Sequence, residues 1–394
     1  MATRGNRFAI LAAYAIVTAS TQMLWLTFAP ITTQAASVMH TSVGNVGDLA
    51  AVFPFVYIVL ALPTGRWLDR QFAKALAAGA LLTGAGALLR LFAPAVYGWQ
   101  FWAQLLVAAG QPVVLNAVNP LATRYFPEKE RPLAIALGSV AVFLGILLAM
   151  VSGPLLYAYG GLWTLFMFQG IFAAIGAVWM TYGLRSPPAF QPETTPATAG
   201  LPWLLKDRFM WHLAALLFIG MGIYNAVATW LEPILAAFGT GAQAGNLLAL
   251  MTVAGIAGAA FLPPLAASSD RRRTMLVGAT TFTGLTFAAL AWHHSRWWSA
   301  AWLGLDGFLL LACLPVVLEW AELHAGPQYQ GFAVGFLMMA GNLGGLVLVV
   351  IAQILLHNAY LPLLVLTGFA LAGAGLSFGL PGHGREHLWT HSIS

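Results

Sequence analysis

Amide and aromatic side chains are the chemically capable groups that stand in the middle of long apolar runs in this sequence. They are Gln22, Trp25, Gln111, Asn116, Asn119, Tyr224, Asn225 and Asn342. A cation over a Trp or Tyr ring gains about 0.5–2 kcal/mol from the ring quadrupole, without needing a buried counter-charge. An anion would require Lys or Arg at the same depth, which neither half of the sequence supplies. The set therefore predicts a binding site for a small quaternary ammonium ion.

The same residues also have structural interpretations, which stay open. Trp and Tyr gather where a helix leaves a membrane, and we expect this role for most of the 15 tryptophans. Asn and Gln in membrane helices often bond a neighbouring helix, contributing on average about 0.6 kcal/mol. This second interpretation applies above all to Asn116 and Asn119.

Two acids in one apolar run are further candidates. Asp306 is the acid nearest to the middle of the run 297–321, and an ionisable residue at such a depth is by default a functional candidate. Asp306 could carry a proton. Glu319 lies nearer the end of the same run, where a gating role and a solvated position are both open.

The sequence shows no pattern typical of an enzyme or a metal centre. Cys313 is the single cysteine, which rules out a disulfide framework. No His, Glu and Cys set has metal-ligand spacing. The tail 381–394 spaces three histidines four residues apart, but nothing after its Pro-Gly pair predicts a helix, so a solvated tail is expected. The glycines at 341–345 lie inside an apolar run and predict helix packing. We therefore expect no enzymatic activity and no cofactor.

Composition places these groups in a membrane. Hydrophobic residues make up 60% of the 394 residues and charged residues 7%, whereas soluble domains average about 45–50% apolar. Runs of roughly 20 apolar residues are long enough to cross about 30 Å of hydrocarbon as a helix, and a barrel would show alternating ten-residue strands instead. The runs are 8–29, 46–65, 75–93, 99–122, 133–157, 162–184, 209–237, 243–267, 274–292, 297–321, 331–356 and 360–380. The predicted fold is an all-α membrane protein with twelve transmembrane helices.

The distribution of basic residues predicts the orientation of these helices. With the N-terminus inside, only Arg90 and Arg296 of the 17 Lys and Arg residues fall at outer ends. Basic residues near helix ends are retained on the cytoplasmic side. We therefore expect a multi-pass protein of the plasma (inner) membrane with both termini in the cytoplasm. A nucleic-acid site would need a contiguous basic face with stacking aromatics, which the sequence lacks, so nucleic acid is not an expected partner.

A polar, proline-rich segment at 185–208 divides the chain into halves. We expect six-helix bundles at 1–184 and 209–380, a cytoplasmic linker at 185–208 and a cytoplasmic tail at 381–394. The halves repeat one another. Asp69-Arg70 recurs 201 residues later as Asp270-Arg271, and Asn6-Arg7-Phe8 recurs at the same offset as Asp207-Arg208-Phe209. This is the pattern of a transporter built from parallel repeats.

The stretch GRWLDRQFAK at 65–74 resembles the Gly-x-x-x-Asp-Arg loop signature of the major facilitator superfamily, although the usual second Gly and following Arg are Phe72 and Ala73 here. The resemblance implies two pseudo-symmetric bundles that bind a small molecule, and we expect a monomer. It also implies that Asp69 meets the start of the eleventh helix while an inner gate is closed, with Asp270 in the mirror role. The candidate gating residues are Asp69, Arg70, Asp270, Arg271 and Glu319.

Four shorter motifs stand in the predicted helices. Trp25 lies 18 residues after Arg7, Gln111 stands in AAGQPVVLN, Glu319 stands in LPVVLEWAE and Asn342 stands in MAGNLGG. These motifs resemble the feline leukaemia virus subgroup C receptor-related branch, whose members move haem, choline or ethanolamine. The resemblance implies a facilitative transporter of a choline- or ethanolamine-like cation. The alternative is a proton-coupled exporter of drugs or haem, because Gly153-Pro154 faintly resembles an antiporter signature and Asp306 could carry the proton.

Overall fold

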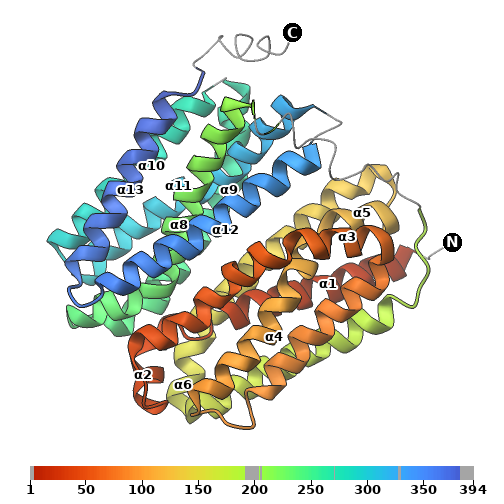
Figure 1. The fold of residues 1–394 in the computed structure, drawn as a ribbon, viewed down its shortest axis with the longest axis horizontal. Helices are drawn as coiled ribbons and strands as arrows, with labels where there is room; N and C mark the ends of the chain where they lie inside the picture. The colour runs from red at the N-terminus through yellow and green to blue at the C-terminus, as the bar shows by residue number, and fades with distance from the viewer. Residues whose placement is uncertain (1–3, 191–203, 205, 270, 327–329, 382–394) are drawn as a thin grey trace. The chain divides into compact units, whose positions relative to one another are not determined.

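The computed structural model describes residues 4–190, 204, 206–269, 271–326 and 330–381. Every regular element in these ranges is helical (Figure 1). The helices are α1 (Arg4–Trp25), α2 (Thr32–Val38), α3 (Val43–Leu89), α4 (Tyr97–Asn116), α5 (Val118–Tyr125), α6 (Arg131–Gly183), α8 (Arg208–Ala237), α9 (Ala244–Ser268), α10 (Arg272–Trp292), α11 (Arg296–Ala325), α12 (Gln330–Leu355) and α13 (Tyr360–Phe378). Short 3₁₀ turns lie at Ala29–Ile31, Glu128–Glu130 and Gly241–Gln243.

The predicted twelve apolar runs all fall on these helices. Within the described ranges, nine helical stretches are long and apolar enough to cross a membrane, and the bent pair α4 and α5 makes a tenth. Two of the nine, α3 and α6, each contain a non-helical break and carry two predicted runs. Counting each of these two helices as two membrane segments raises the number of segments from ten to twelve. The predicted fold class is confirmed.

Backbone geometry explains both breaks. In α6 the break is at Gly160 and Gly161, and Gly161 has φ +66° and ψ −160°, a conformation that is essentially restricted to glycine. In α3 the break is at Gln71, with φ −140° and ψ 58°. The second break follows directly after the Asp69-Arg70 pair of the loop signature.

The first membrane segment is discontinuous. Helix α1 ends at Trp25, and a short irregular stretch precedes the 3₁₀ turn Ala29–Ile31 and α2. Pro30 in that turn has no N–H, and a proline ring clashes with the carbonyl of the residue four positions earlier. The Pro-Ile pair of this turn recurs in the second half as Pro233-Ile234, but there it lies inside the continuous helix α8. Trp25 thus stands at a helix break, whereas its counterpart region does not break.

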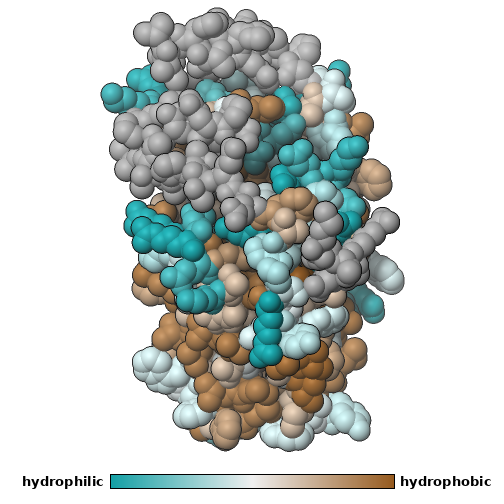
Figure 2. Space-filling view, turned by 90° about the vertical axis from the view of Figure 1, so that its right-hand side faces the viewer, coloured by the Kyte–Doolittle hydropathy of each residue, from teal (hydrophilic) through white to brown (hydrophobic). Residues whose placement is uncertain are grey.

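The chain divides into two compact units, unit 1 (Met1–Thr194) and unit 2 (Thr195–Ser394). In unit 1, α1 packs on α6 and α3 packs on α4. In unit 2, α8 packs on α12, α9 on α11, and α10 on α13. Hydrophobic residues cover a broad region of the face seen in Figure 2, and hydrophilic residues gather nearer one end of it.

The sequence repeat has a structural counterpart inside each unit. Phe8, near the start of α1, makes an edge-to-face contact with Phe126 just after α5, with ring centroids 5.3 Å apart. Phe209, near the start of α8, makes the same kind of contact with Trp320 of α11, also at 5.3 Å. In both units, the first helix is therefore anchored by an aromatic pair to the end of the fourth membrane segment.

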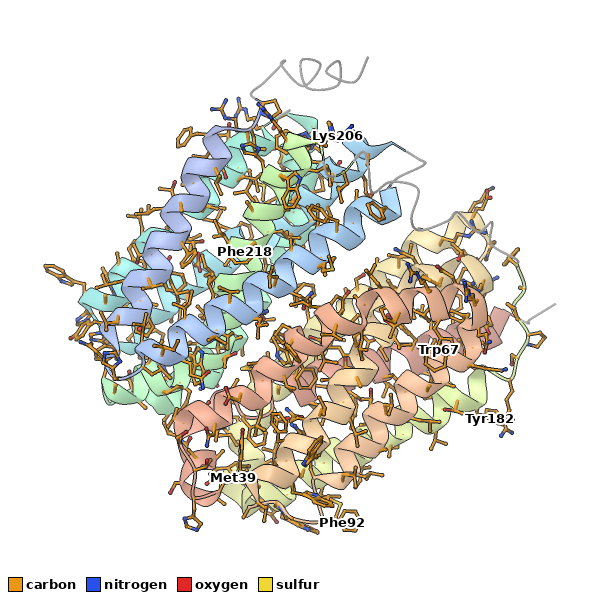
Figure 3. The ribbon with its side chains drawn as sticks, in the orientation of Figure 1. Met39, Trp67, Phe92, Tyr182, Lys206 and Phe218 are labelled. Carbon is orange, nitrogen blue, oxygen red and sulfur yellow. The ribbon has the colours of Figure 1, made fainter. Side chains whose placement is uncertain are left out.

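The glycines at 341–345 are packing positions, as the sequence indicates. A Cβ atom on Gly344 would collide with the backbone carbonyl of Phe218 on α8, which is labelled in Figure 3. A Cβ atom on Gly345 would collide with the side-chain amide of Asn225. Helices α8 and α12 approach so closely because these positions have no side chain, so the prediction of a helix-packing cluster is confirmed.

Candidate functional site

Trp25 is fixed by a hydrogen bond at the break after α1. Its indole Nε1 donates to the backbone oxygen of Ala50 on α3, at 3.2 Å. The side chain is half-buried and packs against a buried apolar cluster that includes Leu24 and Phe53. The hydrogen bond fixes the orientation of the ring, so its faces are the part of Trp25 that can contact a ligand.

The end of α1 is held by a cation and an amide from other helices. Nη2 of Arg90 and Nε2 of Gln104 both donate to the backbone oxygen of Leu24, each at 3.2 Å. The last four carbonyls of a helix have no partner within the helix, and this end of the helix carries partial negative charge. Arg90 and Gln104 therefore stabilise the terminus on which Trp25 stands.

Arg90 is fully buried, at 0% exposure, and its charge is balanced by polar and aromatic groups. Nη1 donates to Thr27 Oγ1 at 2.8 Å and to Gln169 Oε1 at 3.1 Å, and Nη2 also donates to Gln104 Oε1. The guanidinium carbon lies 5.5 Å and 5.4 Å from the ring centroids of Phe28 and Phe166. A buried charge is tolerated when it is hydrogen-bonded, and ring faces add attraction.

Gln111 is a buried amide without a partner in the described ranges. It lies seven residues after Gln104 on α4, and residues seven apart share a helix face, so both amides point toward the same side of α4. Gln111 is 5% exposed and makes no hydrogen bond to any described residue. An amide buried in a membrane segment normally finds a partner. Gln111 is therefore available to a ligand.

Asn116 forms a pair with an aromatic residue that the sequence did not single out. Its Oδ1 accepts a hydrogen bond from the hydroxyl of Tyr57 on α3, at 2.9 Å. Tyr57 is buried and lies seven residues after Ala50, on the α3 face that holds Trp25. Asn119 is exposed on α5 and is not part of this arrangement. Unit 1 thus carries Trp25 on α1, Tyr57 on α3, and Gln111 and Asn116 on α4, and the structure pairs Tyr57 with Asn116.

In unit 2 the predicted polar residues differ in whether their side chains already have a partner within the protein. Tyr224 interacts with Thr252 of α9, and Asn342 bonds the backbone oxygen of Met338 on its own helix at 2.9 Å. Asn225 is 5% exposed, and its side-chain amide lies against Gly345 without a hydrogen bond to a described residue. Asn225 is therefore, like Gln111 in unit 1, a buried amide without a hydrogen-bond partner among the described residues.

Asp306 lies inside unit 2 with one oxygen satisfied. Its Oδ1 accepts a hydrogen bond from Thr283 Oγ1 of α10 at 2.7 Å, and the residue is 0% exposed. Its Oδ2 is buried and has no partner among the described residues. A proton on this carboxyl group would therefore first affect its hydrogen bond with Thr283.

The predicted gating residues occupy several positions. Asp69 and Arg70 are exposed on α3 directly before the break at Gln71. Arg271 is the exposed N-cap of α10. Glu319 pairs with the next arginine, Arg272, at 3.3 Å. Asp270, the predicted linker core 191–203 and the tail 382–394 lie outside the described residues. No group of three His, Cys, Asp or Glu able to hold a metal occurs in the ranges that the structure describes.

Sequence reasoning missed Arg90, Gln104 and Tyr57. Arg90 ends an apolar run, where it was assigned to the outer end of its helix, and the structure places it at the C-cap of α3. The sequence could not show that its side chain turns into the bundle. The signal available was a pair of glutamines, Gln104 and Gln169, in apolar runs, because buried amide oxygens can balance a cation.

Known proteins share this architecture. A family model described as Major Facilitator Superfamily matches residues 10–349. Solute carrier family 49 member A3 of Danio rerio is 27% identical over 401 residues, covering 95% of this chain and 83% of its own length. The choline/ethanolamine transporter flvcr2b of Danio rerio is 22% identical over 327 residues, covering 76% of this chain and 67% of its own.

A solved structure agrees with the fold. The crystal structure of a bacterial homologue of the human lysosomal transporter Spinster matches with a TM-score of 0.77 at 15% identity, covering 95% of this chain and 97% of its own. The family match covers most of the sequence, and the helices carry the twelve apolar runs. The chain is therefore a multi-pass membrane transporter that belongs to the major facilitator superfamily.

Proposed function

We propose that this transporter carries a small organic cation of the choline or ethanolamine type by alternating access, without a coupling ion. The observation that carries the proposal is Gln111, a buried amide with no hydrogen-bond partner among the described residues. It lies on the α4 face whose other glutamine, Gln104, holds the helix end under Trp25. An uncommitted amide on α4 and an oriented aromatic ring at the end of α1 suit a ligand that has a hydroxyl or amine group and an ammonium group.

The ring and the amide would bind different parts of the ligand. A cation on the face of Trp25 or Tyr57 would gain about 0.5–2 kcal/mol, while Gln111 offers both a donor and an acceptor to the polar end of the ligand. Arg90 does not present its terminal nitrogens to such a ligand, because Leu24, Gln104 and Gln169 already accept hydrogen bonds from both of them. The similarity to flvcr2b, described as a choline/ethanolamine transporter, supports this substrate class.

From unit 2 we propose Asn225 as a second substrate contact. Its side-chain amide is buried and makes no hydrogen bond to a described residue. Tyr224 and Asn342 are weaker contributors, since Thr252 and the Met338 carbonyl already engage them. A transporter needs ligand contacts whose strength differs between its states, and an uncommitted amide can change partners at little cost.

The test compares choline with its neutral carbon analogue, dimethylbutanol, in binding to the purified protein and in uptake by proteoliposomes. Trp25→Ala removes the ring, and Trp25→Phe keeps a ring face while losing the indole donor to Ala50. We expect Trp25→Ala to weaken choline binding by about two- to thirtyfold, the equivalent of 0.5–2 kcal/mol. Trp25→Phe should retain part of the affinity, and neither variant should alter binding of the neutral analogue to the same degree.

Trp297→Ala is the matched control, because this tryptophan is exposed at the start of α11 and lies outside the proposed site. Gln111→Ala should reduce affinity for choline and ethanolamine. Gln111→Glu keeps acceptor oxygens at this position but lacks the amide donor. Equal binding of choline and dimethylbutanol by the parent protein would show that no ring recognises the charge. The substrate proposal would then be wrong, although membership of the superfamily would stand.

Asp306 favours a second candidate, proton-coupled export. Its unpartnered Oδ2 is buried inside unit 2, and a carboxyl group in such a position is a candidate to bind and release a proton. Asp306→Asn keeps an acceptor for Thr283 but cannot titrate. Under this candidate, a pH gradient drives uptake by the parent and not by the variant, while substrate exchange without a gradient continues in both. Uptake by the parent that ignores the gradient rules the candidate out.

A further inference from the structure

Unit 1 contains a cavity at the end where three of its helical segments terminate. The cavity has a volume of about 340 Å³ and is lined by residues 71–74 of α3, by Arg124 and Tyr125 at the end of α5, and by Leu184 and residues 186–188 after α6. None of the substrate-site residues proposed above lines it. All of its lining lies within unit 1.

Hydrogen bonds hold the walls of this cavity in place. The hydroxyl of Tyr125 donates to the backbone oxygen of Ser186 at 3.1 Å. The backbone N–H groups of Ala189 and Phe190 both donate to the backbone oxygen of Arg124, each at 3.0 Å. The chain after α6 is therefore hydrogen-bonded to the end of α5. The third side of the cavity is formed by α3 at its break at Gln71.

Two cations line the cavity without a carboxylate in salt-bridge contact. Lys74 is exposed, and Arg124 lies with its guanidinium carbon 4.8 Å from the ring centroid of Phe72. Neither forms an ion pair with an acid in the described part of the chain. Asp69 attracts Arg124 from a longer distance. Guanidinium and ammonium groups together form a strong binding site for a phosphate group.

The remaining walls are apolar. Phe72, Tyr125 and Leu184 are buried side chains that face the same cavity as the two cations. A free inorganic anion would contact the cations alone and leave the space beside these apolar walls unfilled. A molecule with a phosphate group and a hydrocarbon chain would cover both.

The cavity lies where helices leave the membrane. The first part of α3, residues 43–70, is about 42 Å long at 1.5 Å per residue, more than the roughly 30 Å of hydrocarbon it has to cross. Trp67 and Tyr182 are 39% and 68% exposed, and exposed Trp and Tyr are typical of the membrane boundary. Figure 3 shows both toward one end of unit 1, with Met39 and Phe92 toward the other.

We propose that this cavity binds the headgroup of an anionic phospholipid. The phosphate group lies between Lys74 and Arg124, and the upper part of an acyl chain covers Phe72 and Leu184. Basic pockets between membrane helices bind phospholipid headgroups by this combination of charge and apolar contact. The site is independent of the substrate, so it can be tested whether or not choline is transported.

The experiment is native mass spectrometry of the full-length purified protein after incubation with phosphatidylglycerol or phosphatidylcholine. The parent should retain phosphatidylglycerol in preference to phosphatidylcholine. Lys74→Gln and Arg124→Gln should each weaken retention about fivefold, since one basic residue near a membrane surface contributes about 1 kcal/mol. Asp69→Asn should strengthen retention, because it removes the acid that attracts Arg124.

Lys129→Gln is the matched control. Lys129 is exposed in unit 1 but does not line the cavity, so its loss should leave retention unchanged. Equal losses in Lys129→Gln and Lys74→Gln would show general surface attraction and overturn the proposal. Inorganic phosphate that stabilises the protein as well as phosphatidylglycerol does would also overturn it, because the ligand would then be a soluble anion. Lys74 is exposed, so Lys74→Gln keeps the test valid if Arg124→Gln fails to fold.

Discussion

Nε2 of His324 lies 2.6 Å from Oδ2 of Asp207, so a single carboxylate serves two helices of unit 2. The other oxygen, Oδ1, accepts a hydrogen bond from the backbone N–H of Met210 at 3.0 Å and caps the start of α8. His324 stands in the last turn of α11. Both side chains of the pair are less than a tenth exposed. The start of α8 and the end of α11 are therefore joined through Asp207.

Replacing Asp207 should destabilise unit 2 in two steps. Asp207→Asn keeps a capping oxygen for Met210 and loses the charge, whereas Asp207→Ala loses both. We expect a loss of about 1 kcal/mol for the cap and a further 1–3 kcal/mol where His324 is left without its acceptor. Thermal unfolding in detergent should rank the parent above Asp207→Asn and Asp207→Asn above Asp207→Ala. An unchanged melting temperature for Asp207→Ala would contradict this role.

The stabilisation of the folded state by the charge of Asp207 should disappear in acid. Burial raises the pKa of Asp207, but the hydrogen bonds from His324 and from the Met210 amide outweigh burial and hold the pKa below its ordinary value. The stabilisation is therefore present above the ordinary carboxyl pKa, about 4, and is lost as pH falls through the lower folded-state value. The difference in melting temperature between the parent and Asp207→Asn should shrink as the pH is lowered below about 4. A difference that stays constant there would exclude the charged pair as its source.

Arg90→Lys should destabilise unit 1 although it keeps the positive charge. A lysine cannot present the planar fork that reaches Leu24, Gln104 and Gln169 at once. Hydrogen bonds to charged groups contribute about 1.5–3 kcal/mol each, so the loss of one or two should lower the melting temperature clearly. Arg296→Lys is the control, because Arg296 is exposed and contacts only the ring of Trp297 among its described neighbours. Equal effects of the two variants would show that the fork geometry is unimportant.

Two glycines on α12 should respond in opposite ways to alanine. Gly344 lies against the backbone of Phe218, so Gly344→Ala forces α8 and α12 apart, and overpacking of this kind typically costs about 1–3 kcal/mol. Gly335 has open space around its Cα, so Gly335→Ala should be neutral or stabilising by up to about 1 kcal/mol. Thermal unfolding of the two variants beside the parent tests the close approach of the helices. A Gly344→Ala protein as stable as the parent would mean that α8 and α12 are less tightly packed at this position.

Reporter fusions should place both the linker and the C-terminus in the cytoplasm. Only two of the 17 Lys and Arg residues are expected at outer ends, and basic residues near helix ends are kept inside during insertion. Reporters joined after Ser394 and within 186–205 should therefore both show cytoplasmic activity. A signal from the outer side at either position would contradict the predicted topology.

The helices and their packing could be predicted from the sequence because both depend on properties that a linear pattern contains. Runs of apolar residues determine where helices cross a membrane, and the glycines at 341–345 indicate a close helix contact whatever their partner is. The repeat of Arg7-Phe8 as Arg208-Phe209 also found a structural counterpart in the two aromatic pairs.

The site was predicted less completely because side-chain direction is set by tertiary packing. Trp25 and Gln111 were singled out by type and depth, but the partner that fixes α1, Arg90, comes from another helix. Asn119 is exposed, whereas Asn116 three residues earlier is held by a hydrogen bond from Tyr57. Glu319 pairs with Arg272, and the repeat had drawn attention to Arg271 instead. One residue is enough to rotate a side chain by about 100° around a helix.

The buried position of Arg90 has a consequence for the order in which the protein is made. Arg90 and Gln104 emerge in neighbouring segments, but Gln169 and Phe166 belong to the second part of α6. At about 5–20 residues per second, the 79 residues that separate Arg90 from Gln169 take about 4–16 s to translate. During that time the guanidinium group has the end of α1 and Gln104 as partners. The insertion of α6 is therefore the step of biogenesis that completes the burial of this charge.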